Sequence, residues 1–519
     1  MEIIKNFIEI GGVSVDPISM NSYNVSNLLR IGGLATGLDT DSIVKQLMKV
    51  ASLPLDKLNQ QKQWYQWQQE DLRDINAKLM NLRNNVVASL RLQGTFMAKT
   101  VTSSNPSVAT ATAGANAVNG TYTLSVTQLA SAPTYVATPV ASLINNTGVD
   151  VTLTLNGQSL IIKNNATISD VVNAINSLTS KTSVSATYDS TLNKLFLVSN
   201  KTGAQSTISL TASDVNGQTV LSNLGLPTNG INVNGSNAIF TFNGVQITSS
   251  TNNVTVAGIN VTLTGTTASG QNITLTVSTD VDKIYNTIKN FVDTYNDVIT
   301  QMYTKLTEKR YYDYPPLTDE QKQAMKENDI KLWEEKARSG DLANDETLMR
   351  AYYSLRQVVS STVSGVGSLS SIGITTGQWY EGGKLYIDEA KLKDAIANNL
   401  DKVMQIFTGV YSSDGTTLVS KGIAQQLYGY FENGTFKEGV LGTAINAITR
   451  KAGSSTQLYD NSFIGNRIRE IDDRIAEMQK RLKDLEDRYY RQFTQLEIFV
   501  GQMNTQSAWL NQQIGIMTK

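Results

Sequence analysis

The chain has 519 residues, a formal net charge of −1, and neither cysteine nor histidine. These absences exclude a disulfide framework, thiol catalysis and Cys-ligated zinc, and they remove the commonest general base and metal ligand. The near-zero charge provides no general attraction to nucleic acid, and no apolar run approaches the ~18 residues of a membrane span, so we expect no cofactor, no metal site, no nucleic-acid partner and no membrane insertion.

The first 30 residues mix Glu and Lys into a short apolar patch and lack a small-residue cleavage site, which makes them a poor secretory signal. We interpret residues 1–30 as a flexible extension. Residues 31–50 then predict a glycine-containing approach to a short helix, capped by Asp39 or Thr40, with Ile43, Leu47 and Val50 on one face.

A long helix is predicted to follow, with Ser52 as its cap and Pro54 tolerated in its first turn. Its apolar side chains recur in steps of seven with a second row between them, as in a coiled-coil seam. The seam residues are Leu58, Tyr65, Leu72, Ile75, Leu79, Leu82 and Val86. Trp64 and Trp67 lie off the seam and predict contact with a second surface, in the same chain or in a neighbouring subunit.

Residues 101–280 contain only nine charged side chains and are rich in Thr, Ser, Asn, Val and Gly. This composition is compatible with disorder, but alternating apolar positions separated by turn signals favour folded β modules. Residues 152–162 predict a hairpin around Asn156-Gly157, and Thr167 with Asp170 predicts a capping box that opens a short helix. A second β module is expected over residues 239–277, with another Asn-Gly turn at Asn243-Gly244.

Helical periodicity returns at Val281. The charged segment 308–346 predicts a solvated helix, with Met325, Ile330, Trp333 and Ala337 on one face. A helix over 344–363, a strand pair of residues 372–375 with 384–387, and a helix beginning after Asp388 are expected next.

The C-terminal helix, residues 464–514, has the longest apolar seam in the chain, about five heptads. At ~1.5 Å per residue it would span about 75 Å. Its seam residues are Ile468, Ile471, Ile475, Met478, Leu482, Leu485, Tyr489, Leu496, Phe499, Met503 and Leu510. We expect the two terminal seams to lie side by side in opposite directions.

Charged side chains become scarce after Arg491, where only Glu497 precedes Lys519. Apolar residues nevertheless continue off the seam at Val500 and Trp509. An isolated helix of this composition would expose an aggregation-prone apolar surface to water. We therefore expect both chain ends to be poorly ordered in the free subunit and to become helical on packing.

Together these patterns predict an α+β multidomain protein, in which long N- and C-terminal coiled-coil helices form a stalk or leg that carries inserted β-rich head domains. The expected boundaries are an extension at 1–30, a helical leg at 31–98, β heads at 99–280, a helical leg domain at 281–460 and a coiled coil at 461–519. Within the heads, the inner part takes 99–145 with 225–280, and the outer part takes 146–224.

Several motifs in this order resemble the bacterial flagellar filament cap, the hook-associated protein 2 family. They are GLATGLDTDSIVKQLM at 33–48, the unit 149–212 around ATISDVVNAINSL, NAIFTFNGVQIT at 237–248, DKIYNTIKNFVDTYNDVI at 282–299, SSIGITTG and GGKLYIDEAKLKDAI within 370–396, and RYYRQFTQLEIFVGQMNTQSAWL at 488–510. The resemblance covers nearly all of residues 30–517.

The resemblance implies a structural role without catalysis. It implies a homo-oligomeric ring, commonly pentameric, at the extracellular tip of the filament, which helps exported flagellin fold and insert and prevents its loss. Flagellin, the hook–filament junction proteins and an export chaperone at the C-terminal tail are the implied partners, with export through the flagellar type III pathway. A flagellin-like or junction protein, and a coiled-coil-stalked surface adhesin, remain alternatives, and adhesion by the heads is left open.

Overall fold

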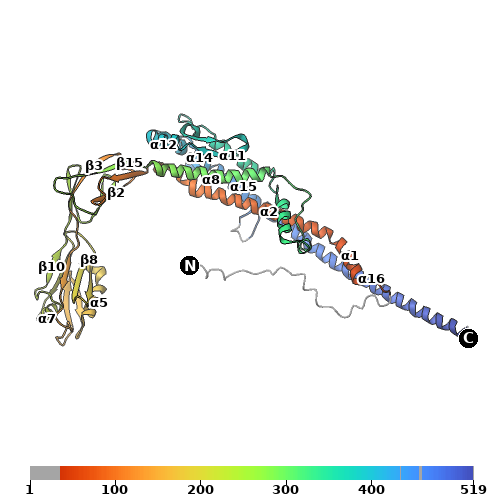
Figure 1. The fold of residues 1–519 in the computed structure, drawn as a ribbon, viewed down its shortest axis with the longest axis horizontal. Helices are drawn as coiled ribbons and strands as arrows, with labels where there is room; N and C mark the ends of the chain where they lie inside the picture. Colours follow the sequence, from red (N-terminus) through yellow and green to blue (C-terminus); the bar gives the residue numbers. More distant parts are fainter. Residues whose placement is uncertain (1–35, 416, 433, 455–458, 518–519) are drawn as a thin grey trace. The chain divides into compact units, whose positions relative to one another are not determined.

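The structure is a computed structural model that describes residues 36–415, 417–432, 434–454 and 459–517 (Figure 1). The extension expected at residues 1–30 lies outside the described residues. The chain forms two compact units. The described residues of the first come from Met1–Lys78, Gln301–Tyr352 and Ala444–Lys519, and those of the second from Leu79–Thr300 and Tyr353–Thr443.

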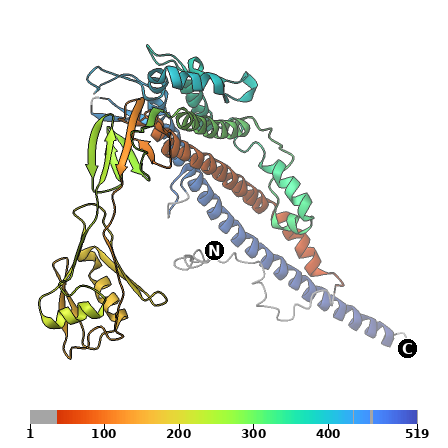
Figure 2. The same ribbon diagram turned by 60° about the vertical axis from the view of Figure 1, so that its left-hand side comes forward.

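The first unit is helical. Its elements include α1 (Thr40–Ala51), α2 (Leu53–Asn81), α9 (Asp319–Gln323), α10 (Glu327–Arg338) and α16 (Phe463–Met517), with parts of α8 (Val281–Thr307), α11 (Glu346–Val359) and α15 (Val440–Ala452). Helix α16 and helix α1 lie side by side in both views (Figure 1 and Figure 2).

The start of the long N-terminal helix differs from the prediction. The carboxylate of Asp39 caps α1 by accepting from the Ser42 amide at 3.0 Å, as expected. Ser52, however, is not the cap of α2: its backbone is helical and its hydroxyl donates back to the Lys49 carbonyl at 3.0 Å. The Asp56 amide also bonds to the Ser52 carbonyl, so the hydrogen-bond pattern continues almost unbroken from α1 into α2.

Two β modules make up much of the second unit, and each has its own apolar core. The inner module contains the sheets β1-β15-β3-β11-β12 and β13-β14-β2. Its strands are β1 (Lys99–Ser103), β2 (Ala109–Ala113), β3 (Gly120–Gln128), β11 (Ala238–Phe242), β12 (Val245–Ser249), β13 (Asn253–Val256), β14 (Ile259–Leu263) and β15 (Ile273–Thr279).

The outer module contains the sheets β10-β9-β5-β6 and β4-β8-β7 together with three helices. Figure 1 labels β8, β10, α5 and α7 in this module. Its elements are β4 (Thr134–Ala137), β5 (Val151–Leu155), β6 (Gln158–Ile162), α5 (Ile168–Ser177), α6 (Thr179–Thr182), β7 (Val184–Asp189), β8 (Lys194–Ser199), β9 (Thr207–Ala212), α7 (Val215–Asn223) and β10 (Ile231–Asn234). This module is wider than the expected 146–224, because β4 pairs with β8 and β10 pairs with β9.

The predicted turns and cap in these modules are confirmed. Asn156 and Gly157 have φ of 48° and 78°, the left-handed values of a type I′ turn, and Leu155 pairs with Gln158 across it. Asn243 and Gly244 repeat this geometry. Thr167 and Asp170 form the expected capping box of α5.

The remainder of the second unit is mainly helical. Its further elements are the π-helical turn η2 (Leu82–Val87), α3 (Ala88–Leu90), α4 (Gln93–Phe96), η3 (Leu369–Ile372), β16 (Ile374–Thr376), η4 (Trp379–Glu381), β17 (Leu385–Ile387), α12 (Glu389–Asn398), α13 (Leu400–Thr408), β18 (Val410–Tyr411), β19 (Leu418–Ser420), α14 (Ile423–Tyr428), β20 (Gly429–Glu432) and β21 (Thr435–Glu438). Phe407 is fully buried there, and its ring centroid lies 5.7 Å from that of Phe96 and 6.0 Å from that of Phe291.

The predicted fold class, α+β with long terminal helices and inserted β-rich domains, is confirmed by this element order. The π-helical turn was not predicted from the heptads. Because a π turn contains one additional residue, it brings both Val86 and Val87 into the core where a regular heptad would bury only the first.

Candidate assembly surface on the terminal helices

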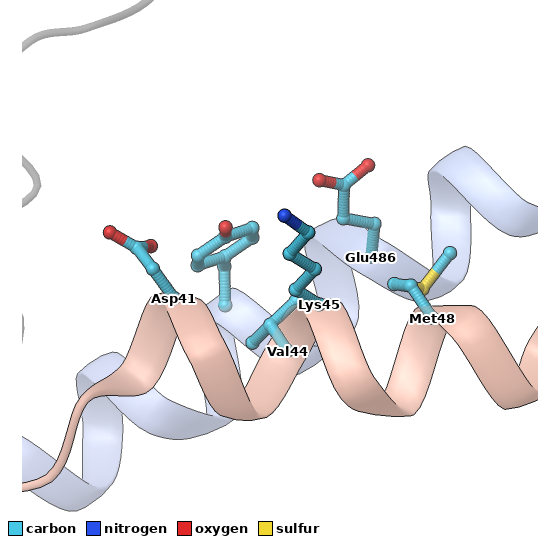
Figure 3. Close-up of a pocket in the computed structure, with 6 residues that line it drawn as sticks. Asp41, Val44, Lys45, Met48 and Glu486 are labelled. Carbon is cyan, nitrogen blue, oxygen red and sulfur yellow. The ribbon is translucent and has the colours of Figure 1, made fainter. Parts of the chain in front are cut away.

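Helix α1 packs antiparallel against α16. A hollow of about 370 Å³ lies between them, lined by Asp41, Val44, Lys45, Met48, Glu486 and Tyr490 (Figure 3). Val44 is buried, and the hydroxyl of Thr36, just before α1, donates to Glu497 of α16. Thr36 thus lies beside residue 497 of α16, whereas the later residues of α1 lie beside residues 486–490. The two helices therefore run in opposite directions.

The face of α1 that was expected to carry Ile43, Leu47 and Val50 is not the face that packs against α16. Leu47 and Val50 are exposed, whereas Val44 is buried and Met48 is half-buried. The sequence contains two apolar rows on adjacent sides of this short helix, and periodicity alone does not show which row has a partner. In the structure the Val44–Met48 row faces α16.

Helix α2 continues the antiparallel arrangement. Lys62 pairs with Asp472 of α16 at 2.6 Å. Further along α2, Arg73 donates to the Ala452 carbonyl at 2.9 Å and pairs with Asp460 at 2.8 Å. Partial burial acts to raise the pKa of Asp460, but hydrogen bonds from Ser462 and the Arg73 charge outweigh it and hold that pKa below its usual value.

The predicted N-terminal seam therefore has more than one partner along its length. Its first residues, Leu58 and Tyr65, are half-buried near the Lys62–Asp472 pair. Its later residues are fully buried: Leu72, Ile75, Leu79, Leu82 and Val86. Polar contacts around Leu72 go to the end of α15, where Asn76 donates to Thr449 at 2.9 Å. The two seams thus lie antiparallel, as expected, but over only part of their length.

The C-terminal seam is buried or half-buried up to Tyr489 and exposed from Leu496 onward. Ile471 is buried with 4% of its surface exposed. The next group is half-buried: Ile468, Ile475, Met478, Leu482, Leu485 and Tyr489. The last group is exposed: Leu496 at 41%, Phe499 at 60%, Met503 at 51% and Leu510 at 52%.

Apolar residues off the seam enlarge this exposed surface. Ile498 is 57% exposed, Trp509 60% and Ile514 56%. We call the seven residues Leu496, Ile498, Phe499, Met503, Trp509, Leu510 and Ile514 the terminal apolar surface. Helix α16 is continuous through these residues, and the order of this end in the free subunit stays a prediction. Exposed apolar patches of this kind are typical of interaction surfaces.

The two tryptophans of α2 contact the same chain. Trp67 is buried, and the guanidinium of Arg310 lies over the ring of Trp64. Of the two expected partners for these residues, the intrachain one is therefore observed. On α10, Ala337 is buried and Trp333 donates to the Pro315 carbonyl at 2.8 Å. Met325, which was expected to share this helical face, lies between α9 and α10.

Within the described residues, no group of three or more acidic side chains is placed to hold a metal ion. No helix in the same part of the chain is both long and apolar enough to cross a membrane.

Comparison with known proteins agrees with this architecture. The family model described as the C-terminus of flagellar hook-associated protein 2 matches residues 235–505, and the corresponding N-terminal model matches residues 36–133. Between them, residues 150–201 match the flagellin hook IN motif, which lies in the outer module.

Relatives and solved structures extend the match to most of the chain. Flagellar hook-associated protein 2 of Halalkalibacterium halodurans is 33% identical over 538 residues, covering 93% of this chain and 99% of the relative. The Escherichia coli K12 protein of the same name is 27% identical, covering 93% and 97%. The crystal structure of the D1-D2-D3 domains of the flagellar cap protein FliD from Escherichia coli aligns with a TM-score of 0.53 at 24% identity, covering 78% of this chain and 99% of that one.

The fold agrees with that of the Escherichia coli cap protein. The family matches on both sides of the β modules define the class as a structural protein of the bacterial flagellum. The chain belongs to the flagellar hook-associated protein 2 family.

Proposed function

We propose that this protein caps the distal end of the bacterial flagellar filament, where it promotes the folding and insertion of exported flagellin and prevents its loss. The observation that carries the proposal is the family match on both sides of the β modules, at 36–133 and 235–505. A flagellin-like or junction protein would share the flagellin hook IN motif at 150–201 but not both flanking matches. The proposed role is structural and needs no catalysis.

The terminal apolar surface supports a packing role for α16. A helix that exposes Phe499, Trp509 and five further apolar side chains is stabilised when those side chains are buried against other chains. We propose that this surface packs into the filament tip and, before export, binds an export chaperone. Both partners follow from the family role and both would cover the same side chains.

We further propose that the subunits form a ring, commonly of five copies, next to flagellin and the hook–filament junction proteins outside the cell. In this arrangement residues 31–98, 281–460 and 461–519 form the leg, and the inner and outer β modules form the head. Export through the flagellar type III pathway would deliver the chain there without a cleaved signal peptide.

The test uses a strain that lacks this chain. We expect electron microscopy to show hooks with absent or very short filaments, and we expect flagellin to accumulate in the culture medium. Expression of the wild-type chain should restore filaments, with the protein detected at filament tips by immunolabelling. Full-length filaments in the deletion strain would contradict the capping role, and filaments of normal length on cells that no longer adhere to surfaces would favour an adhesin.

A further inference from the structure

A closed ionic cluster joins three elements of the first unit. Asp71 lies on α2, Lys305 near the end of α8, and Arg338 and Asp341 at and just beyond the end of α10. Lys305 lies 3.3 Å from Asp341, and Lys305 and Arg338 each pair with Asp71 as well. Only 8% of the Asp71 side chain and none of the Asp341 side chain is exposed.

One carboxylate oxygen of Asp341 accepts hydrogen bonds, and the other has no donor among the described residues. Its Oδ1 accepts from the Leu342 amide at 2.9 Å and from Lys305. Its Oδ2 is buried, and no described donor reaches it. A buried carboxylate oxygen without a donor is costly, so this atom identifies a place where the ionised form of Asp341 is poorly accommodated.

A proton on Oδ2 would remove that cost. Lys305 Nζ contacts a carboxylate oxygen of both Asp71 and Asp341, so the two carboxyl groups lie beside each other. A hydrogen bond between them contributes to the raised pKa of Asp341. Two ionised carboxylates only accept hydrogen bonds, so this bond exists only when one of them is protonated. Since Asp71 already accepts from Lys305 and Arg338, the proton belongs on Asp341.

The charges around the pair agree with that assignment. Helix α2 contributes Asp71 and Glu70, helix α8 contributes Lys305, and Glu308 follows directly after it. The next segment contributes Arg310, and α10 contributes Arg338. With Asp341 neutral, three carboxylates face three cations. Ionised Asp341 adds a fourth carboxylate without a matching cation.

We propose that the proton shared by Asp341 and Asp71 forms a pH-sensitive contact, here called the latch, which holds residues 308–345 against helix α2. Arg338 and Asp341 both lie on this segment, whereas Asp71 lies on α2, so the shared proton joins the two. The proposal does not depend on the capping function.

The pKa of Asp341 determines how the stability of the latch changes with pH. Burial, followed by the hydrogen bond to Asp71 and the Asp71 charge, raises the pKa of Asp341 to about 7, while Lys305 opposes the increase. An unfolded aspartate has a pKa of about 3.9. The closed state therefore binds the additional proton between these values, so its stability falls as pH rises through this window and is constant above about 7.

Hydrogen exchange of the full-length protein tests the latch. After correction for intrinsic exchange, protection of α10 should fall about tenfold for each pH unit between about 4 and the folded-state pKa, and should level off above it. Asp341→Asn keeps the shape of the side chain and supplies an N–H to Asp71 but does not ionise. This variant should lose the pH dependence and keep the protection.

Asp329→Asn is the matched control, because Asp329 lies on α10 and is exposed. This variant should retain the wild-type pH dependence. An Asp341→Asn variant that also retains it, or wild-type protection that does not change with pH, would overturn the proposal. If Asp341→Asn does not fold, carbon NMR of aspartate carboxyl groups in the wild-type protein decides the question. One midpoint near 7 is expected, and midpoints that all lie below about 5 would refute the latch.

Discussion

Lys62 of α2 and Asp472 of α16 form an ion pair of 2.6 Å between opposite ends of the chain. The pair defines the register of the antiparallel terminal helices, because α1 precedes Lys62 and packs beside Glu486 and Tyr490, which follow Asp472. Asp472 occupies one of the charged positions that flank the C-terminal seam in the heptad pattern. A flanking charge with a partner of opposite sign favours one register over its alternatives.

Swapping the Lys62 and Asp472 side chains should leave the free energy of unfolding nearly unchanged. Lys62→Asp alone places two like charges together and should cost about 0.2–1 kcal/mol, since both side chains are partly exposed. Lys62→Asp combined with Asp472→Lys should recover most of that loss. A double-mutant cycle from urea unfolding, repeated at high salt, measures the coupling. A coupling of zero at low salt would show that the pair does not specify the register.

A charge at Ile471 should be far more harmful than the same change at Leu482. Ile471 is buried, so Ile471→Asp leaves an unpaired charge without water and should cost about 3–5 kcal/mol. Leu482 is half-buried, and its charged variant retains contact with solvent. Thermal unfolding followed by circular dichroism compares the two, with Ile471→Val as the control at about 0.5–1.5 kcal/mol. Equal losses at both positions would mean that α16 is covered evenly along its seam.

The terminal apolar surface should matter for assembly and not for the stability of the subunit. Phe499→Ser and Trp509→Ser remove exposed side chains, so each should change the free energy of unfolding by less than about 0.5 kcal/mol. The same variants should shorten filaments in a complementation assay, whereas the exposed polar control Gln495→Ser should not. Normal filaments with both variants would remove the surface from the assembly mechanism.

The order of this helix end can be measured directly. Residues 492–515 have few charged positions, and Gly501 lowers helix propensity by roughly 1 kcal/mol relative to Ala. We therefore expect weak hydrogen-exchange protection of this stretch in the free subunit and stronger protection after assembly. Strong protection in the purified monomer would show that the helix is stable without a partner.

Gly157 and Gly225 both have positive φ, but substitution by alanine should destabilise the protein to very different extents. Gly157 has φ of 78° and open space where a Cβ would lie, so Gly157→Ala should cost only the backbone term, about 1–2 kcal/mol. Gly225 has φ of 74°, but a Cβ there would lie 2.0 Å from the Thr138 carbonyl oxygen. Gly225→Ala should therefore destabilise the outer module considerably more. Equal hydrogen-exchange losses would contradict the close approach at Thr138.

The β modules should fold without the helices. Strands β1 and β15 pair antiparallel with Lys99 opposite Thr279, so both ends of the excised segment lie together. Residues 98–280 expressed alone should melt cooperatively with a β-rich circular dichroism spectrum. A random-coil spectrum would show that the low-charge composition reflects disorder in the absence of the helices.

The sequence by itself determined the local elements. Asn156-Gly157 specifies its turn because the two residues tolerate positive φ, and Thr167 with Asp170 specifies the start of α5 because their side chains satisfy the free amides of the first turn. The heptads of the terminal helices likewise predicted long helices with apolar seams, since side-chain direction repeats with the helical period.

Tertiary structure decided which partner each surface meets. Periodicity did not show that Val44 rather than Leu47 faces α16, that the later part of the α2 seam lies near α15, or that β4 and β10 join the outer module. It also did not reveal the Asp71–Asp341 pair, because its members come from segments distant in sequence and each is an ordinary solvated residue on its own. Burial and charge proximity depend on chain segments that meet only in the folded protein, whereas turns, caps and helical periodicity depend on neighbouring residues.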